Sequence, residues 1–417
     1  MRRAPGPRGT FLLGNLSAFR RDPLGCLAQA AQGYGDIVRL RFGPVTAHLL
    51  NHPDDIEAVL SRGGRAYDKA TRSASRIAAT TGRSLLSGDH QAWQRHRRLI
   101  QPVFQPSVFS GIDPELDRLI DPMVRRWVEE GQVDLVDEMM QLVISAAIRV
   151  LFSEDIDPRR IIAPLEVALA DTWRRIEAPF DLSMLSERLH RRAFRRAVAA
   201  LDALVLDLIQ ARRGAEAPPD DVLTRLLDAH AAEGDSGLSD TELRDATLTL
   251  LLAGHETTAN ALAWALFHAA ERFETAPPAR IFAEALRLHP SIWIIERRAT
   301  RALEIDGYAI PRGSSVLISP FLLHRRRDFW PDPEQFDPER FAERMPRARE
   351  GYLPFGLGSH RCVGLYLANR IALRVIERVF AQVRLHHQGG PSPRHAPGIT
   401  LRHANPVWVR VTSRTGV

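Results

Sequence analysis

The sequence feature that most constrains the fold is one long stretch of helical periodicity over residues 239–272. Ser239 opens it and Glu242 lies three residues later, which is the spacing of a capping box at a helix N-terminus. About 30 residues of helix span roughly 50 Å, because each residue adds about 1.5 Å. A helix of this length crosses a whole domain, so we expect it to lie at the centre of the molecule.

Helical periodicity also dominates the rest of the chain. Further helices are predicted at 89–101, 114–130, 135–152, 159–176, 187–213, 219–232, 279–289 and 364–382. A helical pattern also begins at Pro53, and residues 61–88 are predicted to be a long loop region with one short helix. Strand-like patterns occur at 37–42 and 45–50, around a Gly-Pro turn, and at 303–310, 315–319, 383–385 and 407–411. No internal repeat or Ser/Gly linker divides the chain, which is therefore predicted to be mainly α with minor β-sheets and to form one domain, residues 1–417.

The composition excludes several classes of protein. Of the 417 residues, 45% are hydrophobic and 25% are charged, which excludes disordered, collagen-like and disulfide-stapled chains. Cys26 and Cys362 are the only cysteines, too few for a disulfide framework or a cysteine-rich zinc site. The net charge of +6 comes almost entirely from arginine, because Lys69 is the only lysine, and no nucleic-acid-binding motif accompanies it.

The first residues of the chain bear on its location. Residues 1–9 are rich in arginine, proline and glycine, so they lack the apolar core of a signal peptide. No later stretch reaches the roughly 18 consecutive apolar residues of a membrane span. We therefore expect a cytoplasmic protein with no membrane anchor and no nucleic-acid partner.

The segment FGLGSHRCVG, residues 355–364, comes directly before a helix with apolar periodicity. Its residues alone allow a glycine-rich turn with a buried cysteine, a nucleotide loop or a haem-thiolate loop. Arg361 stands where a GxGxxG loop needs its third glycine, and no βαβ pattern surrounds it, which disfavours the nucleotide loop. In a haem-thiolate loop, glycines bring backbone N–H groups onto the sulfur, and the N-terminus of the next helix favours the thiolate.

This segment resembles the cysteine signature of the cytochrome P-450 family, FGxGx[HR]xCxG, at every fixed position. The resemblance implies a cytochrome P-450 fold, with haem b between the long central helix and the helix after the cysteine loop. It implies that Cys362 is the axial thiolate of the haem iron and that Phe355, Gly356 and Gly364 border the haem. Cys26 lacks this context and is expected to be a structural thiol.

Glu284 and Arg287 form a second match to the family. By spacing alone, a Glu/Arg pair three residues apart on a helix is an ordinary surface ion pair. By resemblance, it is the buried Glu-x-x-Arg pair of the family, completed by Arg340 in the segment PERF, residues 338–341. Its implied role is structural, to brace the cysteine loop.

The third match is AGHETT, residues 253–258, in the middle of the long helix. Alone, it could be an apolar helix with a tolerated glycine and a hydroxyl that bonds back to a carbonyl. The resemblance implies that Ala253 and Gly254 lie against the haem, and that Glu256 and Thr257 are the catalytic acid and alcohol that deliver two protons to dioxygen. His255 is expected to point away from the iron.

A set of cations is expected around the two haem carboxylates, which suit the fork geometry of arginine. Trp93 and Arg97 match the Trp-x-x-x-Arg pattern of the family's third helix, and His360 lies two residues before the cysteine. Arg297 is predicted as a further propionate ligand. Arg298 is its alternative if the register differs by one residue.

The resemblance implies a haem-thiolate monooxygenase that hydroxylates or epoxidises an apolar small molecule, using dioxygen and electrons derived from NAD(P)H. The sequence contains no nicotinamide fingerprint, so electrons are expected from a ferredoxin or flavodoxin with its reductase. The expected docking face carries Arg344, Arg347, Arg349 and Arg361. Alternatives are a peroxide-using or otherwise atypical oxidase on the same fold, which the acid and alcohol pair disfavours, and a haem sensor, which would not need that pair.

Leu250, Trp293 and Ile294 are predicted to line the substrate pocket, together with the loops around 66–88 and 173–190. The arginine bias is typical of a GC-rich bacterial genome, which favours a role in secondary metabolism. The sequence departs from the family at 273–279, where the connection between the Thr257 helix and the Glu284 helix is unusually short.

Overall fold

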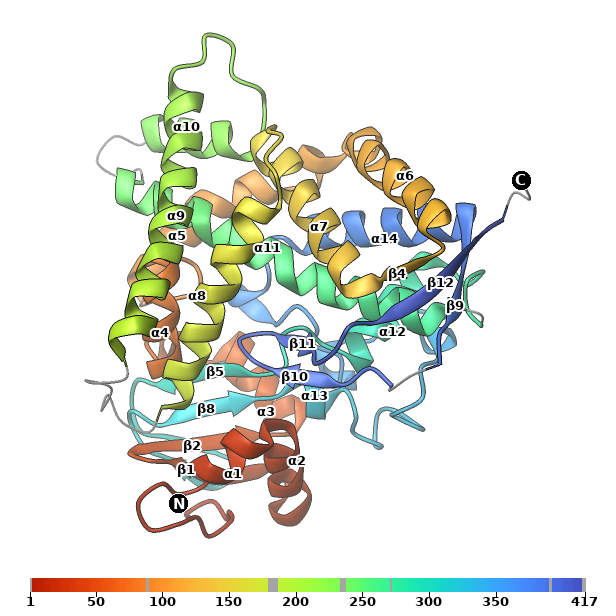
Figure 1. The fold of residues 1–417 in the computed structure, drawn as a ribbon. Helices are drawn as coiled ribbons and strands as arrows, with labels where there is room; N and C mark the ends of the chain where they lie inside the picture. Colours follow the sequence, from red (N-terminus) through yellow and green to blue (C-terminus); the bar gives the residue numbers. More distant parts are fainter. Residues whose placement is uncertain are drawn as a thin grey trace.

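The computed structural model describes residues 2–87, 90–178, 187–232, 238–270, 272–389 and 392–414. Its central element is helix α11, Asp240–Ala269, which packs against α7 (Leu135–Phe152), α12 (Pro278–Leu288) and α14 (Leu365–Gln382) (Figure 1). The predicted capping box is present at its start. Most residues of α11 are buried, so the helix lies at the centre of the molecule as expected.

The other helices surround α11 and its neighbours. They are α1 (Leu16–Arg21), α2 (Pro23–Tyr34), α3 (Pro53–Glu57), α4 (Arg72–Thr81), α5 (His90–Ile100), α6 (Asp113–Glu130), α8 (Arg159–Glu177), α9 (Glu187–Arg213), α10 (Val222–Ala232) and α13 (Pro320–Leu323). Every predicted helix is present, with ends shifted by up to three residues. Helices α1, α2 and α13 were not predicted; α1 and α13 are too short to show a helical period, and α2 contains glycines.

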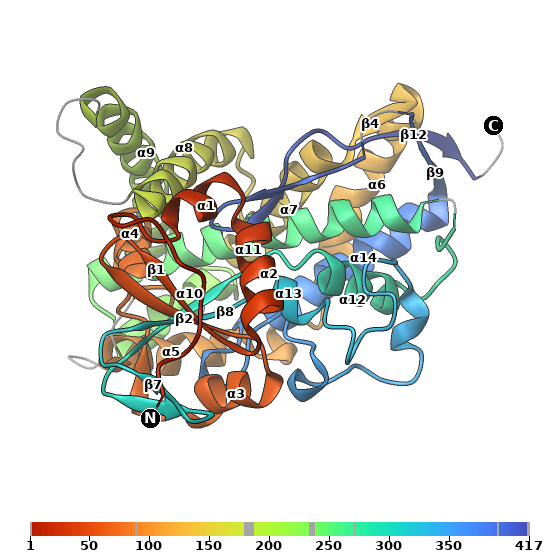
Figure 2. The ribbon, with the colours of Figure 1, turned by 90° about the horizontal axis from the view of Figure 1, so that it is seen from below.

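The largest sheet lies beside the N-terminal helices and has the strand order β1-β2-β8-β5-β3 (Figure 2). Its strands are β1 (Ile37–Phe42), β2 (Val45–Leu50), β8 (Ser315–Ile318), β5 (Ile295–Ala299) and β3 (Tyr67–Asp68). The predicted hairpin is the antiparallel pair β1 and β2. Strand β8 pairs parallel to β2 and antiparallel to β5, so the sheet joins segments more than 240 residues apart in sequence.

Three small sheets complete the fold. They are formed by β6 (Leu303–Ile305) with β7 (Tyr308–Ile310), β4 (Gln132–Asp134) with β12 (Trp408–Ser413) and β9 (Val383–His387), and β10 (His395–Pro397) with β11 (Leu401–His403). The strand-like region 303–310 is thus a hairpin. Asp306 and Gly307 both have positive φ at its turn, the backbone conformation that tight hairpin turns need.

A ladder of ion pairs joins α14 to α6. The pairs are Arg370 with Asp113, Arg374 with Asp117, and Arg378 with Asp121. Successive members are four residues apart on both helices, so each set forms a stripe along one helix face. The ladder helps to position α14, the helix that follows the cysteine loop.

The connection from α11 to α12 is short in the structure as well. Within residues 270–277, the described backbone forms turns in which the N–H of Phe273 bonds the carbonyl of Ala269, and the N–H of Ala276 bonds the carbonyl of Phe273. Among the residues that the structure describes, none of the helices combines the length and the apolar composition needed to cross a bilayer.

Candidate active site

The cysteine loop turns sharply before α14. Gly356 and Gly358 have φ values of +70° and +68°, a region that glycine adopts readily. A Cβ atom on Gly358 would lie 2.3 Å from the carbonyl oxygen of Leu60, so this position requires glycine. The N–H of Cys362 donates to the carbonyl oxygen of Phe355 at 3.0 Å, which closes the loop.

The sulfur of Cys362 lies in an unusual environment. The residue is accessible, yet the surrounding protein raises the pKa of the thiol by desolvation. A hydrogen bond from the Gly364 N–H and the positive charges of Arg97, Arg361 and Lys69 act in the opposite direction. An accessible sulfur with a backbone donor and nearby cations is suited to bind a metal ion as a thiolate.

Helix α11 presents one accessible face in its middle. Ala253, Gly254 and Thr257 are only partly buried, whereas His255, Glu256 and Thr258 are buried. The first three share a face because residues three and four apart are neighbours on a helix. A Cβ atom added to Gly254 would meet no other atom within 4 Å, and the same holds for Gly364 beside the cysteine. The structure therefore leaves space for a flat group at both predicted haem-facing glycines.

Five basic side chains gather close to the cysteine loop: Lys69, His90, Arg97, Arg297 and His360, which we call the cation cluster. His360 feels the charges of the other four. Burial, followed by these charges, lowers the pKa of His360 to about 2. Burial also lowers the pKa of Arg297 to about 10, and it lowers the pKa of Lys69 well below its usual value.

The hydrogen-bond partners of the cation cluster within the protein are uncharged. Arg97 donates to the side-chain oxygen of Gln101 at 2.9 Å and to the carbonyl of Arg361 at 2.6 Å. Lys69 donates to the carbonyl of Leu85 at 2.8 Å, and Arg297 donates to the carbonyl of its neighbour Glu296 at 2.9 Å. The ring of His360 lies against that of Trp93, with centroids 3.7 Å apart and planes tilted by 32°, and its Nδ1 has no hydrogen-bond partner. Within the described ranges, no carboxylate lies within ion-pair distance of a cluster member. Arg297 is buried and the other members are partly buried. A buried cation without a counterion is costly, so the cluster fits a ligand that carries two carboxylates, as haem does.

The structure resolves the choice of register between Arg297 and Arg298. Successive residues of strand β5 point to opposite faces. Arg298 pairs with Asp68, through bonds of 3.1 Å and 2.7 Å, on the other side of the strand from the cluster. Arg297 is therefore the residue that faces the other predicted cations.

Glu284 and Arg287 form a fully buried ion pair on α12. Both side chains are 0% exposed, and the Nε and Nη2 atoms of Arg287 donate to the two carboxylate oxygens at 2.6 Å and 2.8 Å. The remaining N–H groups of Arg287 donate to the carbonyls of His324, Pro333 and Gln335. The third predicted member is more loosely attached, because the Nε of Arg340 lies 3.4 Å from Glu284.

His324 connects this pair to the cysteine loop. Its Nε2 accepts the N–H of Leu353 at 2.8 Å, so the proton is on Nδ1, which faces the carbonyl of Arg287 at 3.1 Å. Burial lowers the pKa of His324 to about 3, which keeps the ring neutral. The Glu284/Arg287 pair is thereby linked to a residue two positions before Phe355.

Comparison with known proteins decides the family. The sequence matches the family described as cytochrome P-450 over residues 4–276 and 279–408. This chain belongs to the cytochrome P-450 family. The break between the two matched segments, at Pro277 and Pro278, falls in the short connection between α11 and α12.

Its relatives include bacterial P-450 enzymes of similar length. Cyclooctatin synthase of Streptomyces melanosporofaciens is 31% identical and aligns over 96% of this chain and 94% of the relative. Cyclooctat-9-en-7-ol 5-monooxygenase of the same species is also 31% identical, over 95% of this chain and 90% of the relative. Pentalenene oxygenase of Streptomyces avermitilis is 26% identical, over 98% and 97%. The chain is thus a cytochrome P-450 monooxygenase, an enzyme class that uses haem, dioxygen and donated electrons.

The side chains of Glu256 and Thr257 lie in different surroundings. The hydroxyl of Thr257 donates to the carbonyl of Ala253 at 2.8 Å on the accessible face of α11. The buried carboxylate of Glu256 instead accepts the hydroxyl of Thr400 at 2.5 Å and forms an ion pair with Arg402 of β11. Glu256 therefore contacts the β10–β11 hairpin and not the hydroxyl of Thr257.

His255 lies on the opposite side of α11 from the accessible face. It is 3% exposed and lies against α7 beside the backbone of Met140. Burial lowers its pKa to about 4. Its expected orientation, away from the haem side, agrees with this position.

The predicted substrate residues are less clearly placed. Trp293 is 0% exposed and packs in a core cluster with Leu27 and Leu40, and its indole N–H donates to the carbonyl of Gly398 at 2.9 Å. Its assignment to the pocket wall is therefore corrected, because a fully buried side chain does not line an open space. Leu250 is 5% exposed in the main core, and Ile294 is half-buried.

Several residues of the site were missed by sequence reasoning. They are Lys69 and His90 in the cation cluster, His324 at the brace, and Thr400 and Arg402 beside Glu256. Of these residues, only Lys69 stands out in the sequence, because it is the only lysine and all other strongly basic residues are arginines. The others have ordinary local sequences and reach the site through tertiary contacts.

Proposed function

We propose that this cytochrome P-450 binds haem b with Cys362 as its axial ligand, and that residues 1–417 form a single haem domain. The cation cluster carries this proposal, because Arg297 is buried, Lys69 and Arg97 are partly buried, and none of the three has a carboxylate partner among the described residues. Arg97, Arg297 and His360, with Lys69, would hold the two haem carboxylates. Trp93 supports the His360 ring by direct contact between the two rings.

The residues near Cys362 fit the same group. Gly364 donates its N–H to the sulfur and leaves open space beside it, and Gly254 leaves open space on α11. Ala253 and Gly356, with Phe355, would complete the border of the haem. When bound, the haem supplies the reductive activation of dioxygen and the transfer of one oxygen atom to the substrate.

Proton delivery is assigned to Thr257 and Glu256. The hydroxyl of Thr257 faces the accessible side of α11, where it can pass a proton from its Oγ1. The carboxylate of Glu256 is held by Arg402, whose side chain is 29% exposed, and by Thr400. Arg402 thus connects the buried acid to the molecular surface. When Glu256 takes up a proton, its ion pair with Arg402 breaks.

The substrate is proposed to be an apolar small molecule that is hydroxylated or epoxidised in bacterial secondary metabolism. The names of the relatives support this class, since pentalenene is named as an alkene and cyclooctat-9-en-7-ol as an unsaturated alcohol. The pocket that receives it is proposed to include Leu250 and Ile294. The test is to record absorption spectra of the ferric holoenzyme with a panel of such compounds. A compound that displaces water from the iron identifies the substrate class.

Electrons are proposed to come from NAD(P)H through a ferredoxin or flavodoxin and its reductase. Two of the four predicted docking arginines already have acidic partners, since Arg344 pairs with Glu350 and Arg349 pairs with Glu57. Arg347 and Arg361 are exposed and form no ion pair with a described carboxylate. Replacing these two by glutamine is expected to slow reduction most, whereas unchanged reduction rates would contradict this docking face.

The reaction class is tested with the holoenzyme. Cys362→Ser is expected to abolish the thiolate signature of the reduced carbon-monoxide spectrum. Thr257→Ala is expected to keep that signature and to divert electrons from product to peroxide, measured as product formed per NAD(P)H consumed. If Thr257→Ala instead has no effect and peroxide alone supports full turnover, the enzyme is a peroxygenase; if no substrate is turned over by either route, it is a haem sensor.

A further inference from the structure

A small apolar finger projects from the N-terminal edge of the molecule. Residues 10–14 form a tight hairpin, in which the N–H groups of Thr10 and Gly14 each donate to the carbonyl of the other residue at 2.9 Å. At its tip, Phe11 is 93% exposed and Leu12 is 68% exposed, the highest values among the exposed large hydrophobic residues of the described chain. We call residues 10–14 the N-terminal finger.

Hydrogen bonds from a neighbouring strand hold the backbone of the finger in place. The guanidinium of Arg41, on β1, donates to the carbonyls of Thr10 and Phe11 at 2.5 Å and 2.6 Å, and to that of Leu12 at 3.2 Å. Gly14 has φ +62°, and a Cβ there would lie 2.2 Å from the carbonyl oxygen of Arg41. These contacts hold the backbone of the finger and leave both apolar side chains in solvent.

The surroundings of the finger are strongly basic. Residues 1–21 contain five arginines and no aspartate or glutamate. Arg8, Arg20 and Arg21 are exposed. Asp22, which caps α2, is the next acid in the sequence, and Glu177 feels the charge of Arg20. The segment therefore presents a net positive charge beside two exposed apolar side chains.

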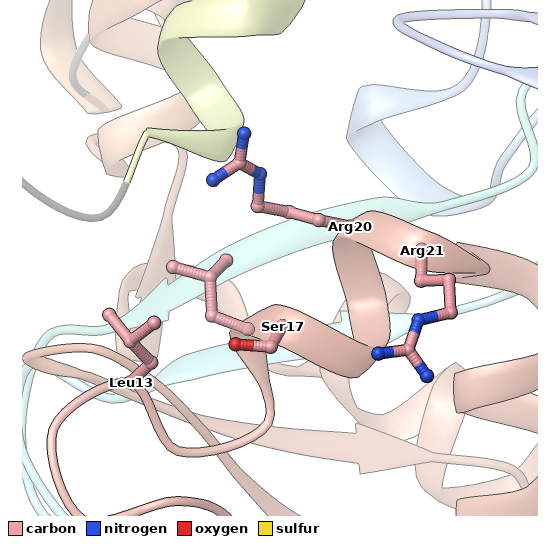
Figure 3. A pocket seen from close by; sticks show the side chains of 5 residues that line it. Leu13, Ser17, Arg20 and Arg21 are labelled. Carbon is pink, nitrogen blue, oxygen red and sulfur yellow. The ribbon is translucent and has the colours of Figure 1, made fainter.

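An open hollow of about 360 Å³ lies next to the finger. It is lined by Leu13, Leu16, Ser17, Arg20 and Arg21. Figure 3 shows Arg20 and Arg21 extending from α1 in different directions. The hydroxyl of Ser17 points toward Leu13 of the finger. An apolar floor with a guanidinium group on either side is suited to acyl chains whose phosphates meet Arg20 and Arg21 separately.

We propose that the N-terminal finger and this hollow dock the enzyme on the surface of an anionic lipid bilayer. Phe11 and Leu12 insert among the acyl chains, and Arg20 and Arg21 contact lipid phosphates. Peripheral binding of this kind combines apolar burial with attraction to anionic lipids and needs no membrane-spanning helix. Arg20 of α1 lies close enough to Glu177, at the end of α8, to influence its charge. The docked edge therefore adjoins the segment around 173–190 that is proposed to border the substrate pocket.

The test uses the full-length holoenzyme and sedimentation with vesicles of phosphatidylglycerol and phosphatidylcholine. Binding is expected to phosphatidylglycerol vesicles, to weaken with salt, and to be small for phosphatidylcholine alone. Phe11→Ser with Leu12→Ser is expected to lower the partition coefficient at least about tenfold, because burial of two large apolar side chains is lost. Arg20→Gln and Arg21→Gln are each expected to lower it about fivefold.

A matched control is available on β12, which lies far from α1 in both overall views (Figures 1 and 2). Trp408, 47% exposed, and Arg410, also exposed, supply one apolar and one cationic residue. Trp408→Ser with Arg410→Gln is expected to leave lipid binding unchanged. The carbon-monoxide spectrum of every variant reports whether the haem fold is intact.

The other outcomes would overturn the proposal. Equal binding to both lipids, no binding by the wild type, or an equal loss in the β12 control would each show that the finger is not a lipid-docking site. Loss of binding in the arginine variants without loss in the Phe11/Leu12 variant would mean electrostatic adsorption only. A dimer in sedimentation velocity that Phe11→Ser dissociates, without lipid binding, would assign the finger to a second copy of the chain.

Discussion

Arg287 and the cation cluster differ in whether their positive charges have carboxylate partners within this P-450. Arg287 has its charge and its N–H groups satisfied within the protein, by Glu284 and by three backbone carbonyls. The cation cluster around Arg297 has no carboxylate partner among the described residues. The difference teaches that satisfied buried charges support the fold, whereas unsatisfied ones mark the position of a charged ligand.

The largest effect is expected where the satisfied group is broken. Glu284→Gln leaves Arg287 buried without a counterion, which costs about 3 to 5 kcal/mol of stability. Urea unfolding of the variant measures this loss, and Arg287→Leu with Glu284→Leu is expected to recover part of it because both charges are removed. A loss below about 1 kcal/mol for Glu284→Gln would contradict a fully buried ion pair.

The opposite behaviour is expected in the unsatisfied group. Arg297→Leu removes a cation that lacks a partner, so the apoprotein is not expected to lose stability. Haem retention is expected to fall about 10- to 100-fold, because hydrogen bonds to charged groups contribute about 1.5 to 3 kcal/mol. The rate of haem transfer to apomyoglobin measures retention.

Arg298→Leu is the matched control for this variant. It breaks the ion pair with Asp68 on the other face of β5, and it is expected to lower stability without changing haem transfer. If both variants release haem equally fast, the cation cluster does not hold the haem carboxylates.

A smaller effect is expected at His324, which joins the satisfied group to the cysteine loop. Its pKa of about 3 in the folded state lies below the ordinary value near 6.5, so the unfolded chain binds a proton first as the pH falls. Its contribution to stability is therefore complete above about pH 6.5 and is lost towards pH 3, by about 1.4 kcal/mol per pH unit.

Unfolding by urea between pH 6.5 and 4 measures this dependence. His324→Gln is expected to be less stable than the wild type at neutral pH and to show a shallower decline as the pH falls. An identical slope in the variant would show that the neutral state of His324 is not responsible for the acid sensitivity.

The smallest effect is expected on the surface, at the ladder between α6 and α14. Arg374 is 21% exposed and Asp117 is 26% exposed, so water screens their attraction. Arg374→Gln is expected to cost at most about 1 kcal/mol. A double-mutant cycle with Asp117→Asn isolates the pair, and a coupling as large as that of Glu284 with Arg287 would remove the distinction between buried and surface pairs.

Local sequence predicted the parts of the site that depend on neighbouring residues. The glycine spacing around Cys362, the capping box at Ser239 and the Glu284/Arg287 spacing all lie within a few residues, and each is present in the structure. Trp293 shows where this reasoning failed. Its apolar neighbours were consistent with a pocket wall or a core, and the packing of the N-terminal sheet placed it in the core.

The sequence by itself determined the family, the cysteine loop, the long central helix and the residues of the buried pair, because each follows from short-range patterns of side-chain type and spacing. Only the tertiary structure decided that Lys69 and His90 join Arg297 and His360, and that Glu256 is held by Arg402. The physical reason is that these contacts join residues up to about 290 positions apart, which no local period encodes. The same applies to the N-terminal finger, whose exposure depends on the guanidinium of Arg41 on a separate strand.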